Sequence, residues 1–113
     1  MASTLVAQTN QACLDACTEC AQACEACAQA GLNDPAMASC TRLCLDCAAI
    51  CQACVTLLAR NSTWASRLCR LCAEVCDACA AECERHDMAE CQECARTCRS
   101  CAENVPRHSH LGS

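Results

Sequence analysis

The spacing of cysteine is the feature of this sequence that most limits how the chain can fold. Nineteen of its 113 residues are cysteine, and they fall into four groups in which steps of three and four residues alternate. A mean step of 3.5 residues is typical of the face that a helix in a bundle turns towards its neighbours. Most positions between the cysteines hold alanine, glutamate, glutamine, arginine or leucine, which favour helices. The spacing therefore predicts four helices with cysteine at every core position.

Residues that end or begin helices separate the four groups. Gly31 follows the first group as a C′ residue, and either Asn33 or Asp34 can cap the second helix, with Pro35 in its first turn. Short connections make successive helices antiparallel neighbours. The predicted fold is all-α, an antiparallel up-down-up-down four-helix bundle with a cysteine-lined core. We expect one domain over residues 1–105, with helices at about 4–30, 35–60, 63–86 and 88–104, and a flexible tail over 106–113.

Composition and charge exclude several classes of function. The net charge is −5, with 8 basic against 13 acidic residues, and Trp64 is the single aromatic side chain. Nucleic-acid binding needs a basic surface or stacking aromatics, so we expect no nucleic-acid partner. The uncharged stretches are rich in alanine and cysteine rather than leucine, so we expect no membrane span. The first ten residues do not resemble a signal peptide, which favours a cytoplasmic protein.

So many cysteines in a small chain usually indicate a disulfide-linked secreted domain. Here the cysteine count is odd, and glycine and proline total only four residues, whereas such domains are rich in loops. Cysteines three or four apart on one helix hold their Cβ atoms about 5–6 Å apart, too far for the roughly 3.8 Å of a disulfide. We therefore expect the thiols to stay reduced.

A core of thiols alone would be a weak one. Leucine, isoleucine, valine and phenylalanine together make up only 15 of the 113 residues, and cysteine buries little apolar area. Leucine would stabilise the same seam better, so the choice of cysteine indicates a need for sulfur. The absence of paired acids of the kind that hydrolases use favours a binding protein over an enzyme.

The pattern also indicates which metal the sulfur would bind. Repeated C-x-x-C pairs suggest zinc, but here they interlock with C-x-x-x-C pairs, and nothing separates groups of four ligands. Thiolate selects Cu(I), which accepts two sulfurs in near-linear geometry somewhat over 4 Å apart, a separation that neighbouring turns of one helix can supply. We predict close to one Cu(I) per cysteine. The predicted ligands are Cys13, Cys17, Cys20, Cys24, Cys27, Cys40, Cys44, Cys47, Cys51, Cys54, Cys69, Cys72, Cys76, Cys79, Cys83, Cys91, Cys94, Cys98 and Cys101.

The two ends of such a bundle should differ. One end holds most of the large apolar residues and should be plugged: Leu5, Val6, Leu57, Leu58, Trp64, Leu68 and Val105. The other end holds thioether and imidazole groups, which bind Cu(I) as neutral ligands: Met37, His86 and Met88. We expect these three to receive copper at an open mouth. His108 and His110 follow Pro106 in the predicted tail and are assigned no role.

The cysteine ladder over residues 13–101 resembles that of the bacterial copper storage proteins, of the cytosolic type that lacks an export signal. This resemblance implies many Cu(I) ions held by thiolates inside a four-helix bundle, assembly into a homotetramer, and storage of copper or protection against it. Histidine and methionine near the open mouth recur in such proteins, which supports the three residues named above. A copper chaperone or an efflux protein is the expected class of exchange partner.

Two other functions fit cysteine-rich chains. One is sequestration of zinc or cadmium in the manner of metallothionein, which would fill the core with four or five ions. The other is a dithiol oxidoreductase or thiol redox sensor, which needs one exposed cysteine of low pKa with a resolving partner. The ladder offers no unique pair of that kind, so we rank this function last.

Overall fold

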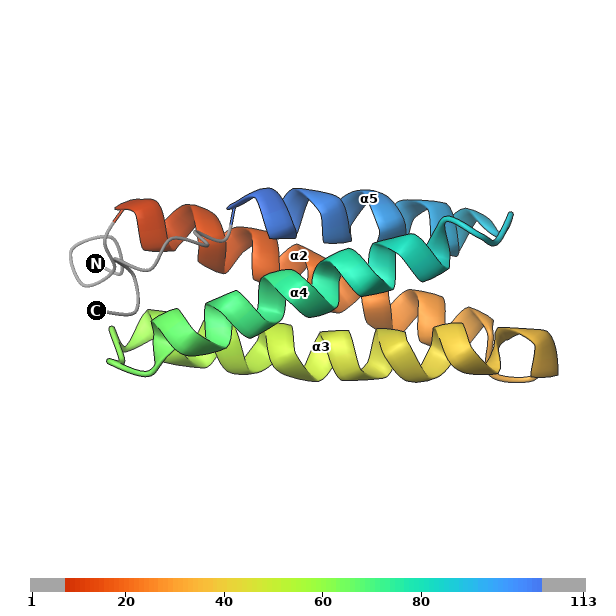
Figure 1. Ribbon diagram of the computed structural model, residues 1–113, viewed down its shortest axis with the longest axis horizontal. Coiled ribbons are helices and arrows are strands. Elements are labelled where there is room, and N and C mark those ends of the chain that lie inside the picture. Colours follow the sequence, from red (N-terminus) through yellow and green to blue (C-terminus); the bar gives the residue numbers. More distant parts are fainter. Residues whose placement is uncertain (1–7, 105–113) are drawn as a thin grey trace.

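The computed structural model describes residues 8–104, with side chains from residue 10 onwards. Within that range the chain forms four long helices and one short 3-10 turn (Figure 1). The elements are α2 (Gln8–Ala30), η1 (Pro35–Met37), α3 (Ala38–Ala59), α4 (Ala65–Cys83) and α5 (Ala89–Asn104). The predicted all-α four-helix bundle is confirmed. The third predicted helix is α4, which ends at Cys83, three residues earlier than predicted. The second is α3, which begins after the η1 turn and not at residue 35 as predicted.

Helices that follow one another in the chain also lie side by side. Both α2 and α4 pack against α3 and α5, so the four helices form a ring in chain order. Figure 1 shows them running antiparallel, with the α2–α3 and α4–α5 connections at one end of the bundle. The α3–α4 connection lies at the other end. The bundle is elongated, with principal extents of 43 × 28 × 17 Å, and its interior is a long narrow column.

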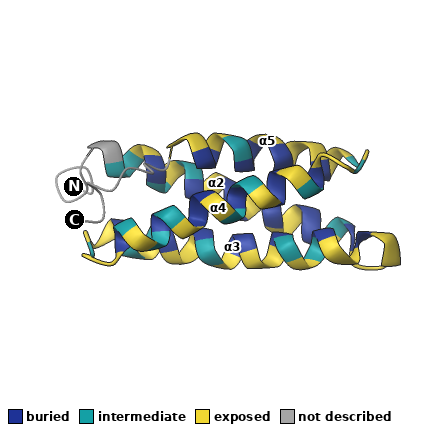
Figure 2. Ribbon diagram, viewed as in Figure 1, coloured by how far each residue is buried: buried dark blue, intermediate teal, exposed yellow. Residues whose placement is uncertain are grey.

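Cysteine and alanine make up nearly all of the buried interior. Every one of the 19 cysteines is at most 1% exposed, and alanines fill most of the other buried positions. Figure 2 shows these buried positions as a repeating stripe along each helix, with exposed residues on the outer face. Among the larger apolar side chains described, only Met37 and Leu58 are buried, and they flank opposite ends of α3. The 3.5-residue spacing thus does place sulfur inside.

The connections next to the column depend on a few specific residues. The Asp34 carboxylate accepts a hydrogen bond of 3.0 Å from the Ala36 amide, as the predicted cap requires. Asn61 ends α3 in the left-handed region, with φ of 53°. Gly31, in contrast, has no positive φ, so the predicted C′ role does not explain it. A Cβ at Gly31 would lie 2.8 Å from Thr41 Oγ1, so glycine permits the close approach of α3.

One segment, Pro35–Ala59, is long and apolar enough to cross a membrane by length and composition alone, with a mean hydropathy of 1.6. Its hydropathy comes largely from cysteine and alanine, and all five of its cysteines are buried in the bundle. The core helix of a bundle passes the same test. The packing of α3 against α2 and α4 accounts for this segment without a membrane.

Candidate metal centre

The buried sulfur atoms form one continuous column of five layers. Four layers take one cysteine from each helix, and the fifth has three because the position after Cys101 in the series is Val105, outside the described residues. From the η1 end, the layers are Cys27, Cys40, Cys83 and Cys91; Cys24, Cys44, Cys79 and Cys94; Cys20, Cys47, Cys76 and Cys98; Cys17, Cys51, Cys72 and Cys101; and Cys13, Cys54 and Cys69. We call the first the mouth layer and the last the closed-end layer.

Sulfur atoms contact one another both along a helix and between helices. Along single helices, Cys20 and Cys24 lie 4.0 Å apart, and Cys72 and Cys76 lie 3.8 Å apart. The shortest distances join different helices: Cys20 to Cys98 is 3.4 Å. Sequence reasoning emphasised neighbours on one helix and missed the pairs between helices. Helix axes lie about 8–10 Å apart, and two inward thiols together span that gap.

Contacts between layers make the column continuous. Sγ of Cys44 lies 3.7 Å from Sγ of Cys83 in the mouth layer, and Cys24 lies 3.8 Å from Cys98 in the third layer. Further along, Cys51 lies 3.9 Å from Cys76. Cys54 of the closed-end layer also interacts with Cys72 of the fourth layer. An ion bound between two layers could therefore pass to the next by exchanging one thiolate at a time.

The sulfur atoms also gather into overlapping groups of four. Each group lies within 4.8 Å, and five of them are Cys17, Cys51, Cys72 and Cys101; Cys20, Cys24, Cys47 and Cys98; Cys20, Cys51, Cys76 and Cys101; Cys24, Cys79, Cys94 and Cys98; and Cys27, Cys40, Cys44 and Cys83. Several cysteines, such as Cys20 and Cys98, belong to two groups. Two sulfurs bonded to one Cu(I) at about 2.3 Å each would lie about 4.6 Å apart if linear and about 4.0 Å apart if three-coordinate. The spacing suits both geometries.

All 19 cysteines are free thiols, and the surroundings of several of them change the thiol pKa. Burial raises the pKa of Cys27 and of Cys91 in the mouth layer, because the charged form loses solvation. At the closed end, hydrogen bonds from Cys13 and Cys54 lower the pKa of Cys69 to about 4. Metal binding must displace the remaining protons, since the thiolate is the ligand.

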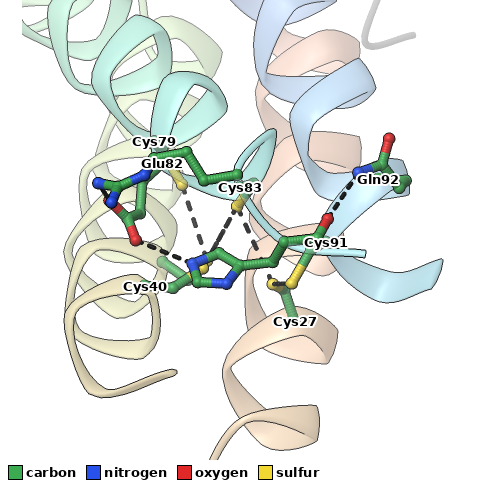
Figure 3. A network of polar contacts seen from close by, with 10 residues as sticks. Cys27, Cys40, Cys79, Glu82, Cys83, Cys91 and Gln92 are labelled. Atoms are coloured by element: carbon green, nitrogen blue, oxygen red, sulfur yellow. Dashed lines mark hydrogen bonds and ion pairs between the residues drawn. The ribbon is translucent and has the colours of Figure 1, made fainter. Parts of the chain in front are cut away.

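The predicted mouth residues all lie at the η1 end of the column. Met37 precedes α3 and is 4% exposed, while Met88 precedes α5 and is partly buried against the core. His86 follows α4, and its Nε2 atom lies 2.9 Å from a carboxylate oxygen of Glu82. Figure 3 shows this end, with sulfur atoms of Cys27, Cys40, Cys83 and Cys91 near its centre. The sequence placed the three residues correctly in the bundle, and their role as ligands stays a prediction.

The closed end is only partly as predicted. Leu58 is buried, and Leu57 and Leu68 are partly buried against the core. Trp64, however, is 63% exposed, so its expected part in the plug is wrong. Its ring instead lies under the Arg67 guanidinium, 5.2 Å from the ring centroid. Five further residues named in the sequence analysis lie outside the described residues: Leu5, Val6 and Val105 of the predicted plug, and His108 and His110 of the tail.

A bundle with a continuous thiol column is built to hold many soft metal ions together rather than one ion at an isolated site. Comparison with known proteins agrees with this class. The sequence model of the copper storage protein family matches residues 6–110. The chain belongs to the copper storage protein family. No curated protein sequence matches it.

Several solved structures are similar along most of the chain. Cu(I)-bound copper storage protein BsCsp3 is 38% identical, with a TM-score of 0.83 over 87% of this chain and 95% of that one. Apo-Csp3 from Bacillus subtilis is 37% identical, with a TM-score of 0.82 over 91% of this chain and 98% of that one. A cytosolic copper storage protein from Streptomyces lividans with five coppers is 35% identical, with a TM-score of 0.82 over 93% and 92% of the two chains.

Proposed function

We propose that this protein stores Cu(I) as thiolate-bound ions along the whole sulfur column. The observation that carries the proposal is the overlap of the four-sulfur groups, because shared ligands suit many ions of single charge. An ionised thiolate buried without a partner would be prohibitively costly. One Cu⁺ per thiolate neutralises the column, so we propose a capacity close to 19 ions.

Copper enters, on this proposal, at the mouth layer. Met37, His86 and Met88 lie at the same end of the bundle as that layer, and each offers a neutral donor atom to an incoming Cu(I) ion. Loading then continues inward by exchange between layers, whose sulfur atoms lie 3.7–3.9 Å apart at the contacts given above. The closed end carries leucines instead, which neither bind nor admit the ion.

The role is storage without catalysis, in the cytoplasm, in a homotetramer. The buried thiols leave no exposed cysteine among the described residues to act as a nucleophile, which supports a non-enzymatic role. The Streptomyces lividans relative is described as cytosolic. Leu45 and Leu71 are 45% and 44% exposed on α3 and α4, where they are available for packing between copies.

Zinc is the second candidate, because four thiolates within 4.8 Å could also form a tetrahedral site. Each cysteine can belong to only one such closed site at a time. The 19 cysteines would therefore hold at most four Zn²⁺ ions with four ligands each. Capacity separates the two metals clearly.

Anaerobic titration of the metal-free protein with Cu(I), against a chromophoric Cu(I) chelator, tests the proposal. We expect binding to continue to about 19 ions per chain, and prior addition of Zn²⁺ to leave this capacity unchanged. Saturation at about four ions, or failure of Cu(I) to displace bound Zn²⁺, would contradict copper storage.

A further inference from the structure

The carboxylate of Glu82 lies at the mouth and is a polar group that copper storage by itself does not use. Its Oε2 atom lies 2.9 Å from Nε2 of His86, one helical turn further along. The other oxygen, Oε1, lies 3.3 Å from the Arg85 guanidinium. The Glu82 and His86 side chains are 18% and 20% exposed, whereas Arg85 is 75% exposed. The Glu82–His86 pair is therefore the more sheltered of the two.

The direction of this hydrogen bond follows from the chemistry of the groups. A carboxylate can only accept a hydrogen bond, so the imidazole must donate through Nε2–H. In the neutral ring the proton then resides on Nε2, and Nδ1 keeps a free lone pair. That lone pair is what an incoming Cu(I) ion needs. The same pairing of carboxylate, histidine and metal fixes the ring in many metal sites.

The backbone of His86 is held as well as its ring. Its amide donates to the Cys83 carbonyl at 3.1 Å, and its carbonyl accepts a hydrogen bond of 2.6 Å from Nε2 of Gln92 on α5. Cys83 belongs to the mouth layer and Gln92 follows Cys91 of the same layer. Figure 3 shows Glu82 and Gln92 on the two sides of this sulfur cluster. The histidine is thus anchored to α4 and α5, two of the four helices that bring cysteines to the mouth.

We infer that Glu82 is a positioning residue for copper loading, which holds His86 in the tautomer that presents Nδ1 to Cu(I) at the mouth layer. The inference rests on the proposed function, since it concerns the route by which the column fills. It assigns Glu82 no contact with the metal. Loss of a carboxylate in such a position typically costs 10–100-fold in metal affinity or activity.

The test compares loading rates of the full chain in anaerobic stopped flow, with Cu(I) presented as a complex with a chromophoric chelator. We expect Glu82→Ala and His86→Ala each to load about tenfold more slowly. The double variant should be no slower than His86→Ala alone, because Glu82 acts through the ring. Glu82→Gln should keep most of the rate, since its amide oxygen can still accept from Nε2–H.

Arg85→Ala is the matched control, because it removes the exposed partner of Glu82 and leaves the His86 contact intact. We expect it to load as the unchanged protein does. A second readout is the ¹⁵N spectrum of the imidazoles, with His86→Ala used for assignment. Glu82→Ala should shift His86 towards the Nδ1–H tautomer, and Arg85→Ala should not.

Results of three kinds would overturn the inference. They are a normal loading rate in Glu82→Ala, an unchanged tautomer in that variant, or slowing that adds to that of His86→Ala. Final capacity is measured in the same samples. If any of these results occurs while the capacity stays at about 19 ions, the role of Glu82 is refuted and copper storage is not. A low capacity in the unchanged protein would instead refute copper storage.

Discussion

The two ends of the sulfur column contain the same ligand in different surroundings. At the mouth layer, Met37 and Met88 pack against the core and the Glu82–His86 pair lies beside it. At the closed end, Leu58 is buried in the core, and Leu57 and Leu68 pack against it. The comparison separates two properties of the protein: the column as a whole determines how much metal is held, and the residues at one end determine how the metal gets in.

Metal removal should have the largest effect, because it affects both ends at once. An ion present at about 1,000 times its Kd stabilises the folded state by about 4 kcal/mol. For a domain of this size we expect the melting temperature to rise by about 15 °C or more. Differential scanning calorimetry of the Cu(I)-loaded and metal-free protein measures this. Equal melting temperatures would mean that the alanine-rich shell alone stabilises the bundle.

Changes at the mouth should slow loading without lowering capacity. We expect the triple variant Met37→Leu, His86→Gln, Met88→Leu to take up Cu(I) at least about tenfold more slowly, because the neutral donors are lost while the packing volume is kept. Trp64→Ala at the other end is the control, and its uptake should be normal. The assignment of the mouth fails if both variants load at the same rate.

The metal-free protein should become less stable in alkaline solution. Burial raises the pKa of Cys27 and Cys91 above the ordinary value of 9.0. A raised pKa contributes stability that is complete below the unfolded value and is lost as the pH rises through the folded value. We therefore expect the urea midpoint to fall above pH about 9. Changing both residues to serine should lessen this fall without abolishing it, because hydrogen bonding to Cys44 also raises the pKa of Cys83. A flat profile in the unchanged protein would contradict the burial effect.

A single change in the middle of the column should have the smallest effect. Cys47 contacts Cys20 at 4.0 Å and Cys76 at 3.7 Å, so its neighbours keep other partners when it is lost. We expect Cys47→Ser to fold normally and to bind about one ion fewer in the anaerobic titration. Loss of all binding in this variant would show that the column is not a shared set of ligands.

The sequence predicted the column well because cysteine periodicity fixes which face of each helix is buried. It predicted the bundle and placed Met37, His86 and Met88 at one end. It failed for Trp64, which is large and apolar and was therefore expected to be buried. Trp64 is the last residue of the α3–α4 connection, where its ring is exposed and contacts Arg67. The Glu82–His86 contact was missed, although the helix predicted over residues 63–86 held both residues, four positions apart.

Contacts between helices were the other gap. Spacing along a chain gives distances within one helix, whereas the 3.4 Å between Cys27 and Cys91 depends on how closely α2 and α5 pack. That closeness comes from alanine at the neighbouring buried positions, such as Ala28 and Ala95. Only the three-dimensional structure shows the resulting sulfur groups.

The most direct test of a continuous copper store is a crystal structure of the protein loaded anaerobically with Cu(I), with anomalous scattering used to find the ions. We predict copper between every pair of adjacent layers, from Cys27 at the mouth to Cys69 at the closed end. Ions confined to the mouth layer, or to separate sites of four sulfurs with empty thiols between them, would contradict the account.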